Sequence, residues 1–211
     1  MNQLLLNIPA FAFATLLLVM VPGQGVAMVL RQSILGGSKA AFLSAIGNCA
    51  GILTWTISSA IGLSAIFAQS QTAYTVLKWV GVTYLVLVSL QTLLALRHEF
   101  GKFDLDTKNE VSNWASFRLG LITNLTNVKA AVYAVAFLPA FVPSNFSLAW
   151  GIFIFGAIWA LVSILWNISL IWTVKKSSVY IQRPVVRRTL TAISAIGIMG
   201  LAVGLALSSG R

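Results

Sequence analysis

The chain has 211 residues, of which 58% are hydrophobic and 9% are charged. A typical soluble domain is about 45–50% apolar and about 25% charged, so this composition excludes an ordinary water-soluble domain, a disordered chain and a disulfide-rich secreted scaffold. The single cysteine, Cys49, and the single histidine, His98, exclude an intrachain disulfide and a multi-histidine metal centre. We therefore predict no metal site and no cofactor.

Six apolar windows follow in chain order, each close to the roughly 20 residues that cross a bilayer. They are Leu4–Leu30, Ala40–Ala68, Ala73–Leu96, Phe117–Val142, Leu148–Val174 and Thr189–Leu207. None alternates apolar and polar residues as the strands of a membrane barrel do. The sequence predicts an all-α integral membrane protein with six transmembrane helices, in a single polytopic membrane domain over 1–211. No Lys or Arg precedes Arg31, so we expect the first window to be a span and not a signal peptide.

The net charge of +10 follows the predicted loops. The second loop (Gln69–Thr72) and the fourth (Pro143–Ser147) carry no charge. The basic residues in or beside the other three loops are Arg31, Lys39, Arg97, Lys102, Lys108, Arg118, Lys175, Lys176, Arg183, Arg187 and Arg188. This positive-inside pattern predicts a multi-pass membrane protein with both termini outside. We expect the run Lys175–Arg188 to contact anionic lipid, ahead of a nucleic-acid or regulatory site.

A polar segment divides the chain into two halves. Residues 99–116 hold all four acidic residues and form a predicted cytoplasmic linker between halves 1–98 and 117–211. Three crossings in each half would make the second half enter the membrane from the opposite side, as in inverted-repeat transporters. The inverted arrangement is a hypothesis from the topology alone, because we find no strong residue-level repeat between the halves.

Two segments interrupt otherwise apolar windows. In the first window, Val21-Pro22-Gly23-Gln24-Gly25 combines a helix-breaking proline with two flexible glycines. In the fourth window, Asn124-Leu125-Thr126-Asn127-Val128-Lys129 places two amides, a hydroxyl and a lysine in an apolar span. At about 1.5 Å per residue from Arg31 and Arg118, both breaks lie roughly 9–14 Å from the cytoplasmic edge. We therefore expect the two breaks to face one another, with Lys129 near the midplane.

The glycine pairs and the deep tryptophans have interpretations other than a role in ligand binding. Gly47 with Gly51, and Gly200 with Gly204, have the GxxxG spacing of close helix packing. They predict packing within the protomer or a homodimer through glycine-rich helix faces. Three tryptophans lie deep in their windows, where we expect helix or lipid contact ahead of a cavity wall: Trp55, Trp159 and Trp166.

Short motifs recur in a specific order over nearly the whole chain. They are Val21-Pro22-Gly23-Gln24-Gly25, Gly36-Gly37-Ser38-Lys39-Ala40-Ala41, Gly47 with Gly51, Val76-Leu77-Lys78-Trp79-Val80-Gly81-Val82-Thr83-Tyr84-Leu85, Phe117-Arg118-Leu119-Gly120, Asn124-Leu125-Thr126-Asn127-Val128-Lys129-Ala130 and Phe137-Leu138-Pro139-Ala140-Phe141-Val142. In this order they resemble the lysine exporter (LysE/RhtB) superfamily of bacterial amino-acid efflux proteins, and within it the homoserine/threonine exporter type. The resemblance implies a protein of the bacterial inner membrane that exports small amino acids or derivatives from the cytoplasm, driven by the proton gradient.

Three positions depart from the family pattern. Gln24 replaces the last proline of the usual Pro-Gly-Pro, as in the homoserine/threonine type, and Val128 replaces the proline of the usual Asn-Pro-Lys. Ile52 stands where many members carry an acid. Without a proline at 128, we expect a weaker break at Asn127.

The leading hypothesis is a secondary transporter for a small zwitterion. Its carboxylate would bind Lys129 and the backbone N–H groups at the broken helix ends. Its ammonium would bind carbonyls freed at 22–25 and side-chain amide oxygens, with Tyr133 and Trp55 as weaker wall residues. The predicted substrate-binding residues are Pro22, Gly23, Gln24, Gly25, Asn124, Thr126, Asn127, Lys129 and Tyr133.

Other function classes fit the sequence less well. An intramembrane enzyme needs a Ser/His, metal or carboxylate constellation, and no predicted span contains an acid or a histidine. A non-transporting membrane scaffold would depend on the glycine faces more than on the polar breaks. Because no acid is available at depth, the mode of transport stays open between a proton antiporter and a facilitator without proton coupling.

Overall fold

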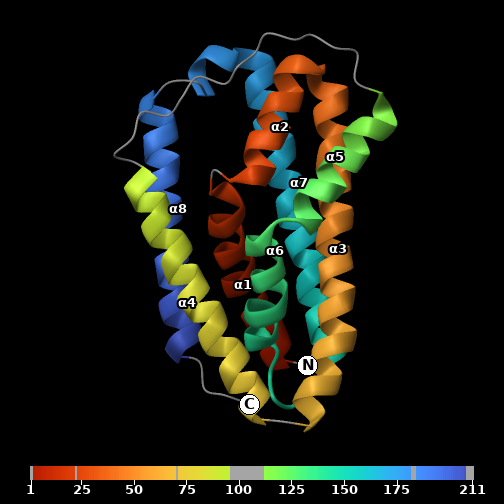
Figure 1. Cartoon of the computed structure of the whole chain (residues 1–211), viewed down its shortest axis with the longest axis vertical. Coiled ribbons are helices and arrows are strands. Elements are labelled where there is room, and N and C mark those ends of the chain that lie inside the picture. The colour runs from red at the N-terminus through yellow and green to blue at the C-terminus, as the bar shows by residue number, and fades with distance from the viewer. Residues whose placement is uncertain (1, 22, 70, 96–111, 182–183, 208–211) are drawn as a thin grey trace.

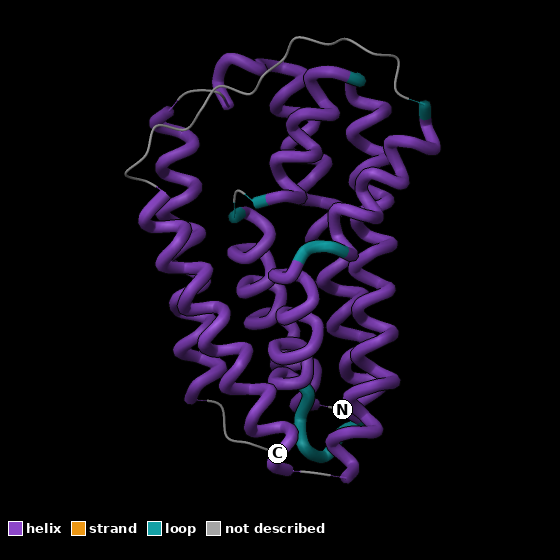
Figure 2. Tube along the Cα trace, viewed as in Figure 1, coloured by secondary structure: helices purple, strands orange, loops and turns teal. Residues whose placement is uncertain are grey.

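The computed structural model describes residues 2–21, 23–69, 71–95, 112–181 and 184–207. Pro22 and most of the predicted linker 99–116 lie outside these residues, and within them there is no strand (Figure 2). The helices are α1 (Asn2–Met20), α2 (Gln24–Leu35), α3 (Gly37–Gln69), α4 (Gln71–Ala95), α5 (Asn113–Leu125), α6 (Val128–Val132), the π-helix η1 (Tyr133–Phe137), the 3₁₀-helix η2 (Leu138–Phe141), α7 (Leu148–Ile181) and α8 (Pro184–Leu207).

Three of these helices are long and apolar enough to cross a membrane. They contain the spans Gln3–Met20, Gly37–Gly62 and Leu148–Lys176. A fourth candidate is the bent pair Asn113–Leu125 and Val128–Phe141, whose parts meet at 58°. The prediction of an all-helical membrane protein is therefore confirmed for the described residues. The predicted number of six spans stays a prediction.

The helices lie side by side along the long axis of the molecule (Figure 1). On one side α3 packs against α5 and α7, and on the other α4 packs against α8. The column formed by α1, α6 and η1 lies between these two groups (Figure 1). Helices from both halves of the sequence thus contact one another directly, and the central column is where both predicted breaks occur.

The α3–α5 contact is made through glycines. A Cβ atom at Gly47 would collide with the Phe117 carbonyl oxygen, and one at Gly120 would collide with the Ser44 carbonyl oxygen. A Cβ at Gly51 would lie 2.6 Å from the Cβ of Asn124. Close packing at the first glycine pair is thus confirmed within the protomer. A homodimer through Gly200 and Gly204 stays a prediction.

Buried aromatic and polar contacts fix the central column. The ring centroids of Phe11 in α1 and Phe155 in α7 are 4.7 Å apart. Tyr133 in η1 is fully buried, and its hydroxyl shares a 2.7 Å hydrogen bond with the hydroxyl of Thr15 in α1. Ser59 in α3 donates a 2.7 Å hydrogen bond to the carbonyl of Ala134 in the same π-helical turn. These contacts tie η1 to α1 and α3, and so hold the adjoining α6 in place.

Candidate functional site

The first break frees a backbone carbonyl. In a continuous helix the carbonyl of Leu18 would accept a hydrogen bond from the N–H of residue 22, but Pro22 has no N–H. The chain leaves the helix after Met20, and the backbone N–H of Val21 donates a 3.3 Å hydrogen bond to the Leu18 oxygen. Gly23 then caps α2 in an extended conformation (φ −137°, ψ −168°). The end of α1 therefore presents a carbonyl with capacity for a second donor.

The second break is stabilised by a side-chain cap. α5 ends at Leu125, and the Asn127 side-chain oxygen accepts a 3.1 Å hydrogen bond from the backbone N–H of Lys129 at the start of α6. Val128 occupies the first helical position, where the family proline would stand, and 59% of its side-chain surface is exposed. The chain still bends by 58° here. The break therefore persists without the proline, because the Asn127 cap begins a new helix.

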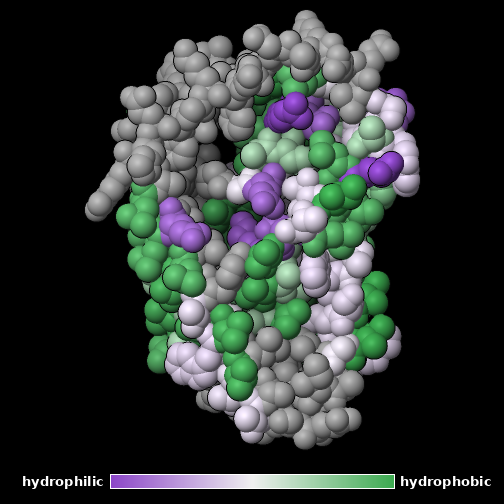
Figure 3. Space-filling view, viewed as in Figure 1, coloured by the Kyte–Doolittle hydropathy of each residue, from purple (hydrophilic) through white to green (hydrophobic). Residues whose placement is uncertain are grey.

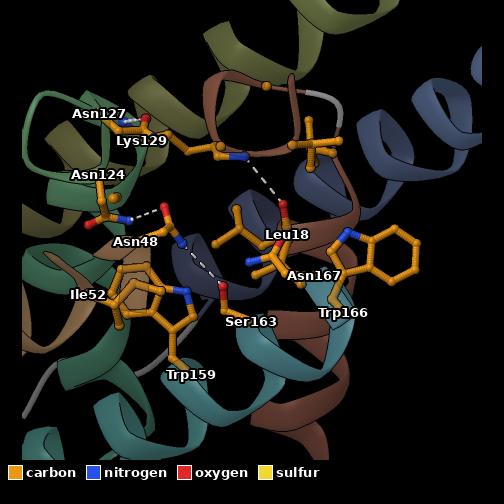
Figure 4. A pocket seen from close by; sticks show the side chains of 16 residues that line it. Leu18, Asn48, Ile52, Asn124, Asn127, Lys129, Trp159, Ser163, Trp166 and Asn167 are labelled. Carbon is orange, nitrogen blue, oxygen red and sulfur yellow. Dashed lines mark hydrogen bonds between the residues drawn. The ribbon is translucent and has the colours of Figure 1, made fainter. Parts of the chain in front are cut away.

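Lys129 joins the two breaks. Its Nζ donates a 3.3 Å hydrogen bond to the Leu18 carbonyl, the same oxygen that Pro22 leaves short of a donor (Figure 4). A Cβ atom at Gly23 would lie 3.6 Å from this Nζ, so the glycine leaves space around the ammonium. All four acidic residues fall between 99 and 110, outside the described residues. In the described structure Lys129 thus has a carbonyl partner and no carboxylate.

A cavity of about 50 Å³ opens beside Lys129, enough for about three to five water molecules. Five of the predicted residues line this cavity: Gly23, Gly25, Asn124, Asn127 and Lys129. The expectation that the two breaks face one another is thereby confirmed, whereas their role in binding stays a prediction. On the face drawn in Figure 3, hydrophilic side chains gather at mid-height between apolar surfaces.

The other predicted residues do not line the cavity. Gln24 and Thr126 are exposed, and the Thr126 hydroxyl donates a 2.8 Å hydrogen bond back to the Ile122 carbonyl. Tyr133 lies in the core, against α1. Pro22 is not among the described residues, but its neighbour Val21 lines the cavity.

The remaining wall comes largely from residues of α3 and α7 that the sequence reasoning did not assign to the site. Asn48 and Ile52 line it from α3. The residues that line it from α7 are Trp159, Ser163, Trp166 and Asn167. The Asn124 amide donates a 3.1 Å hydrogen bond to the Asn48 side-chain oxygen, and the Asn48 amide donates a 3.5 Å hydrogen bond to the Ser163 hydroxyl. Two of the tryptophans for which we expected lipid or helix contact therefore contribute to the cavity wall.

A sequence signal for the α7 wall exists. Positions 159, 163, 166 and 167 recur at helical spacing, which places them on one face of α7. Its polar members, Ser163 and Asn167, interrupt the apolar part of α7 that precedes Ser169. On α3, Asn48 lines the cavity, whereas Ser44, one turn earlier, donates a hydrogen bond to the Ser116 carbonyl. The helical spacing of polar residues could therefore have indicated the face of α7 that contributes to the wall.

Comparisons with known proteins place this arrangement in context. The family model described as LysE type translocator matches residues 16–209. The chain is 25% identical to the uncharacterized membrane protein YrhP of Bacillus subtilis (strain 168), over 99% of this chain and 100% of that protein. It is 31% identical to a homoserine/homoserine lactone efflux protein of Salmonella typhimurium, over 63% of each chain. No solved structure matches the chain.

Proposed function

Because the chain belongs to the LysE type translocator family, we propose that it is a secondary transporter that exports small amino acids or their derivatives, of the homoserine and threonine kind, from the cytoplasm. Members of this family are translocators, which sets the intramembrane enzyme aside. The observation that carries the proposal is the lysine-lined cavity between two broken helices. A relative named for homoserine and homoserine lactone efflux supports the substrate class.

In the proposed binding mode, the cavity binds the two charged ends of a zwitterion at different places. Lys129 binds the carboxylate, together with free N–H groups in the first turn of α2, where Gly25 and Val26 line the cavity. The ammonium binds an amide oxygen. Of the three residues whose amide oxygens were predicted for this role, Asn124 lines the cavity, Asn127 caps α6 through its side-chain oxygen, and Gln24 is exposed.

The proposed transporter has six spans in one polytopic domain, with inverted halves 1–98 and 117–211. α4 and α8 supply the two spans beyond the three apolar helices and the bent pair. The exposed basic residues Arg31, Lys39 and Arg118 mark the cytoplasmic end, so both termini face outward from the bacterial inner membrane.

Efflux from reconstituted vesicles tests the proposal. Vesicles that contain the purified protein are loaded with homoserine or threonine and compared with protein-free vesicles. We expect release that depends on the protein and saturates with substrate concentration. Release no faster than from protein-free vesicles would leave the non-transporting scaffold as the remaining interpretation.

The same vesicles distinguish the two modes of transport. Under proton antiport, an imposed inward proton gradient drives efflux against the substrate gradient. Under facilitated transport, substrate runs down its own gradient only, and efflux is independent of the proton gradient at every pH. Among the described residues that line the cavity, Lys129 is the only one with a titratable side chain. Protonation of Lys129 on carboxylate binding would carry proton and substrate in the same direction. Antiport therefore requires a further proton site.

A further inference from the structure

A cluster of aromatic side chains fills the space between α1, η1, η2 and α7 on one side of the cavity. Trp159 lines the cavity on the side away from Lys129 (Figure 4). The ring centroid of Trp159 lies 4.9 Å from that of Tyr133 in η1. Further rings continue from Tyr133 at centroid distances of 4.7–6.2 Å, which is the spacing of aromatic rings in direct contact. The aromatic cluster consists of Phe11, Tyr133, Phe137, Phe141, Phe155 and Trp159.

The aromatic cluster closes the cavity toward one end of the molecule. Five of its six members are at most 3% exposed, and Phe141 is half-buried. The cluster extends to η2, and the loop after η2 lies at the same end as the N-terminus (Figure 2). On the other side of the cavity, at the start of α2, Gly23, Gly25 and Val26 are all half-exposed. Because charged groups lose their hydration in a packed apolar interior, a zwitterion can leave past the cluster only if the rings separate.

A buried hydrogen bond holds α1 against the aromatic cluster. The hydroxyl oxygens of Thr15 and Tyr133 are 2.7 Å apart, and neither residue is exposed. Thr15 lies one turn before Leu18 on α1, and Tyr133 lies one turn after Lys129. The hydrogen bond therefore joins α1 to the column of α6 and η1 on the cluster side of the Lys129–Leu18 contact. Separation of α1 from η1 would break this bond, and water that enters with the substrate would then hydrate both hydroxyls.

We infer that the aromatic cluster is the external gate of the cavity, and that the Thr15–Tyr133 hydrogen bond stabilises its closed state. The inference rests on the proposed transport function and goes beyond it, because Tyr133 then controls the exit of substrate and does not bind it. In the proposed topology the loop after η2 is external, so substrate that enters from the cytoplasm near α2 leaves past the cluster. Tyr133 also begins a π-helix, and π-helical turns within helices are frequent at functional sites.

The test measures how often the gate opens, by the reaction of a thiol in the cavity with an impermeant reagent. Cys49→Ser removes the native thiol, and Ser163→Cys places a thiol of similar size in the cavity wall. The reagent is anionic sulfonatoethyl methanethiosulfonate, added to intact cells or to inverted membrane vesicles. The face at which Ser144→Cys reacts in the same Cys49→Ser background identifies the side of the aromatic cluster. In this parent protein, Ser163→Cys should react faster from the opposite face.

The gate variants should change the reaction from the Ser144 face in a non-additive way. Tyr133→Phe and Thr15→Val each leave one hydroxyl without its partner in the closed gate, whereas water binds that hydroxyl in the open gate. Each should raise the reaction rate by about 2- to 13-fold, which corresponds to the net contribution of one hydrogen bond. With both substitutions the closed gate holds two apolar groups and no unpaired hydroxyl, so the rate should return to the parent value or below it.

Two control variants test whether the missing hydroxyl causes the effect. Thr15→Ser keeps the hydroxyl and should keep a rate close to that of the parent protein. Its comparison with Thr15→Val decides the question if Tyr133→Phe does not fold. Thr54→Val makes the same change at an exposed position of α3, where the hydroxyl donates to the Ala50 carbonyl of its own helix, and should leave the rate unchanged. Ile52→Cys also lines the cavity and replaces Ser163→Cys if that variant does not fold.

The outcomes separate the gate from the transport function. Equal rates from both faces in the parent protein, or no reaction from either face, would overturn the inference. Unchanged rates in both gate variants would also overturn it, as would increases that add in the double variant, because a general loosening of the packing gives additive effects. Homoserine efflux from vesicles is measured separately. The expected reaction pattern without efflux would retain the gate and reject the proposed substrate, whereas efflux without this pattern would reject the gate alone.

Discussion

Replacement of Lys129 by alanine is expected to weaken substrate binding by about 10- to 150-fold while the protein still folds. Among the described residues that line the cavity, Lys129 carries the only charge, and its ammonium donates a 3.3 Å hydrogen bond to the Leu18 carbonyl. A hydrogen bond between charged groups contributes about 1.5–3 kcal/mol, which corresponds to this range of affinity. Loss of the bond to Leu18 destabilises the fold, but removal of the charge relieves a cost of about 2.5–3.5 kcal/mol for a lysine at mid-membrane.

The assay is homoserine binding to the purified protein in detergent, together with efflux from vesicles. Lys129→Arg keeps the charge but brings a larger, planar group into a cavity of about 50 Å³, so it should also lose transport. Lys175→Ala, at an exposed lysine of α7, serves as the matched control. Wild-type affinity and transport in Lys129→Ala would remove this residue from the mechanism. An equal loss in Lys175→Ala would show that the effect is not specific to the cavity.

Two further predictions concern packing and topology. Gly120→Ala should destabilise the protein by about 1–3 kcal/mol, because its Cβ would collide with the Ser44 carbonyl. Gly200→Ala has nothing within 4 Å of the added Cβ and should keep or raise the thermal midpoint in detergent, because alanine favours a helix over glycine. A midpoint for Gly120→Ala no lower than that of Gly200→Ala would contradict the close α3–α5 contact. In a cysteine-free background, an impermeant thiol reagent added to intact cells should label Ser144→Cys and not Asn113→Cys, and the reverse pattern would mean that the orientation is inverted.

Hydropathy predicted where helices occur but not where they break. The window Ala40–Ala68 matches α3, because one continuous helix spans it. The window Phe117–Val142 divides into α5, α6, a π-helix and a 3₁₀-helix, because Asn127 caps a new helix and Pro139 cannot donate a backbone hydrogen bond. α7 extends past Val174 to Ile181, since the helical backbone can continue where apolar side chains end.

The candidate site likewise combines residues that stand out in the sequence with residues that only the tertiary packing brings to the cavity. Gly23, Asn127 and Lys129 stood out because each is unusual within its own segment. Asn48 and Ser163 were not assigned to the site, because helical spacing places polar residues on one face of a helix but does not say what that face contacts. Their role depends on the approach of α3 to α5 and α7, and only the packed structure brings their side chains into one hydrogen-bonded chain.

The proline of the first break and the lysine of the second break are linked through the carbonyl of Leu18. In an unbroken membrane helix each carbonyl already accepts the N–H four residues on, so a lysine from a neighbouring helix could use only its second lone pair. Pro22 removes that N–H for Leu18, and the Nζ of Lys129 instead donates a 3.3 Å hydrogen bond to the Leu18 carbonyl.

One neutral carbonyl is a weak partner for a charge that costs about 2.5–3.5 kcal/mol to bury. The remaining stabilisation of the buried ammonium must come from water or an anion in the adjoining cavity. A substrate carboxylate is the stronger partner, because a hydrogen bond between two charged groups is stronger than one to a neutral carbonyl. Substrate binding would then draw Lys129 away from Leu18, and so change the one direct hydrogen bond found between the breaks in the described structure.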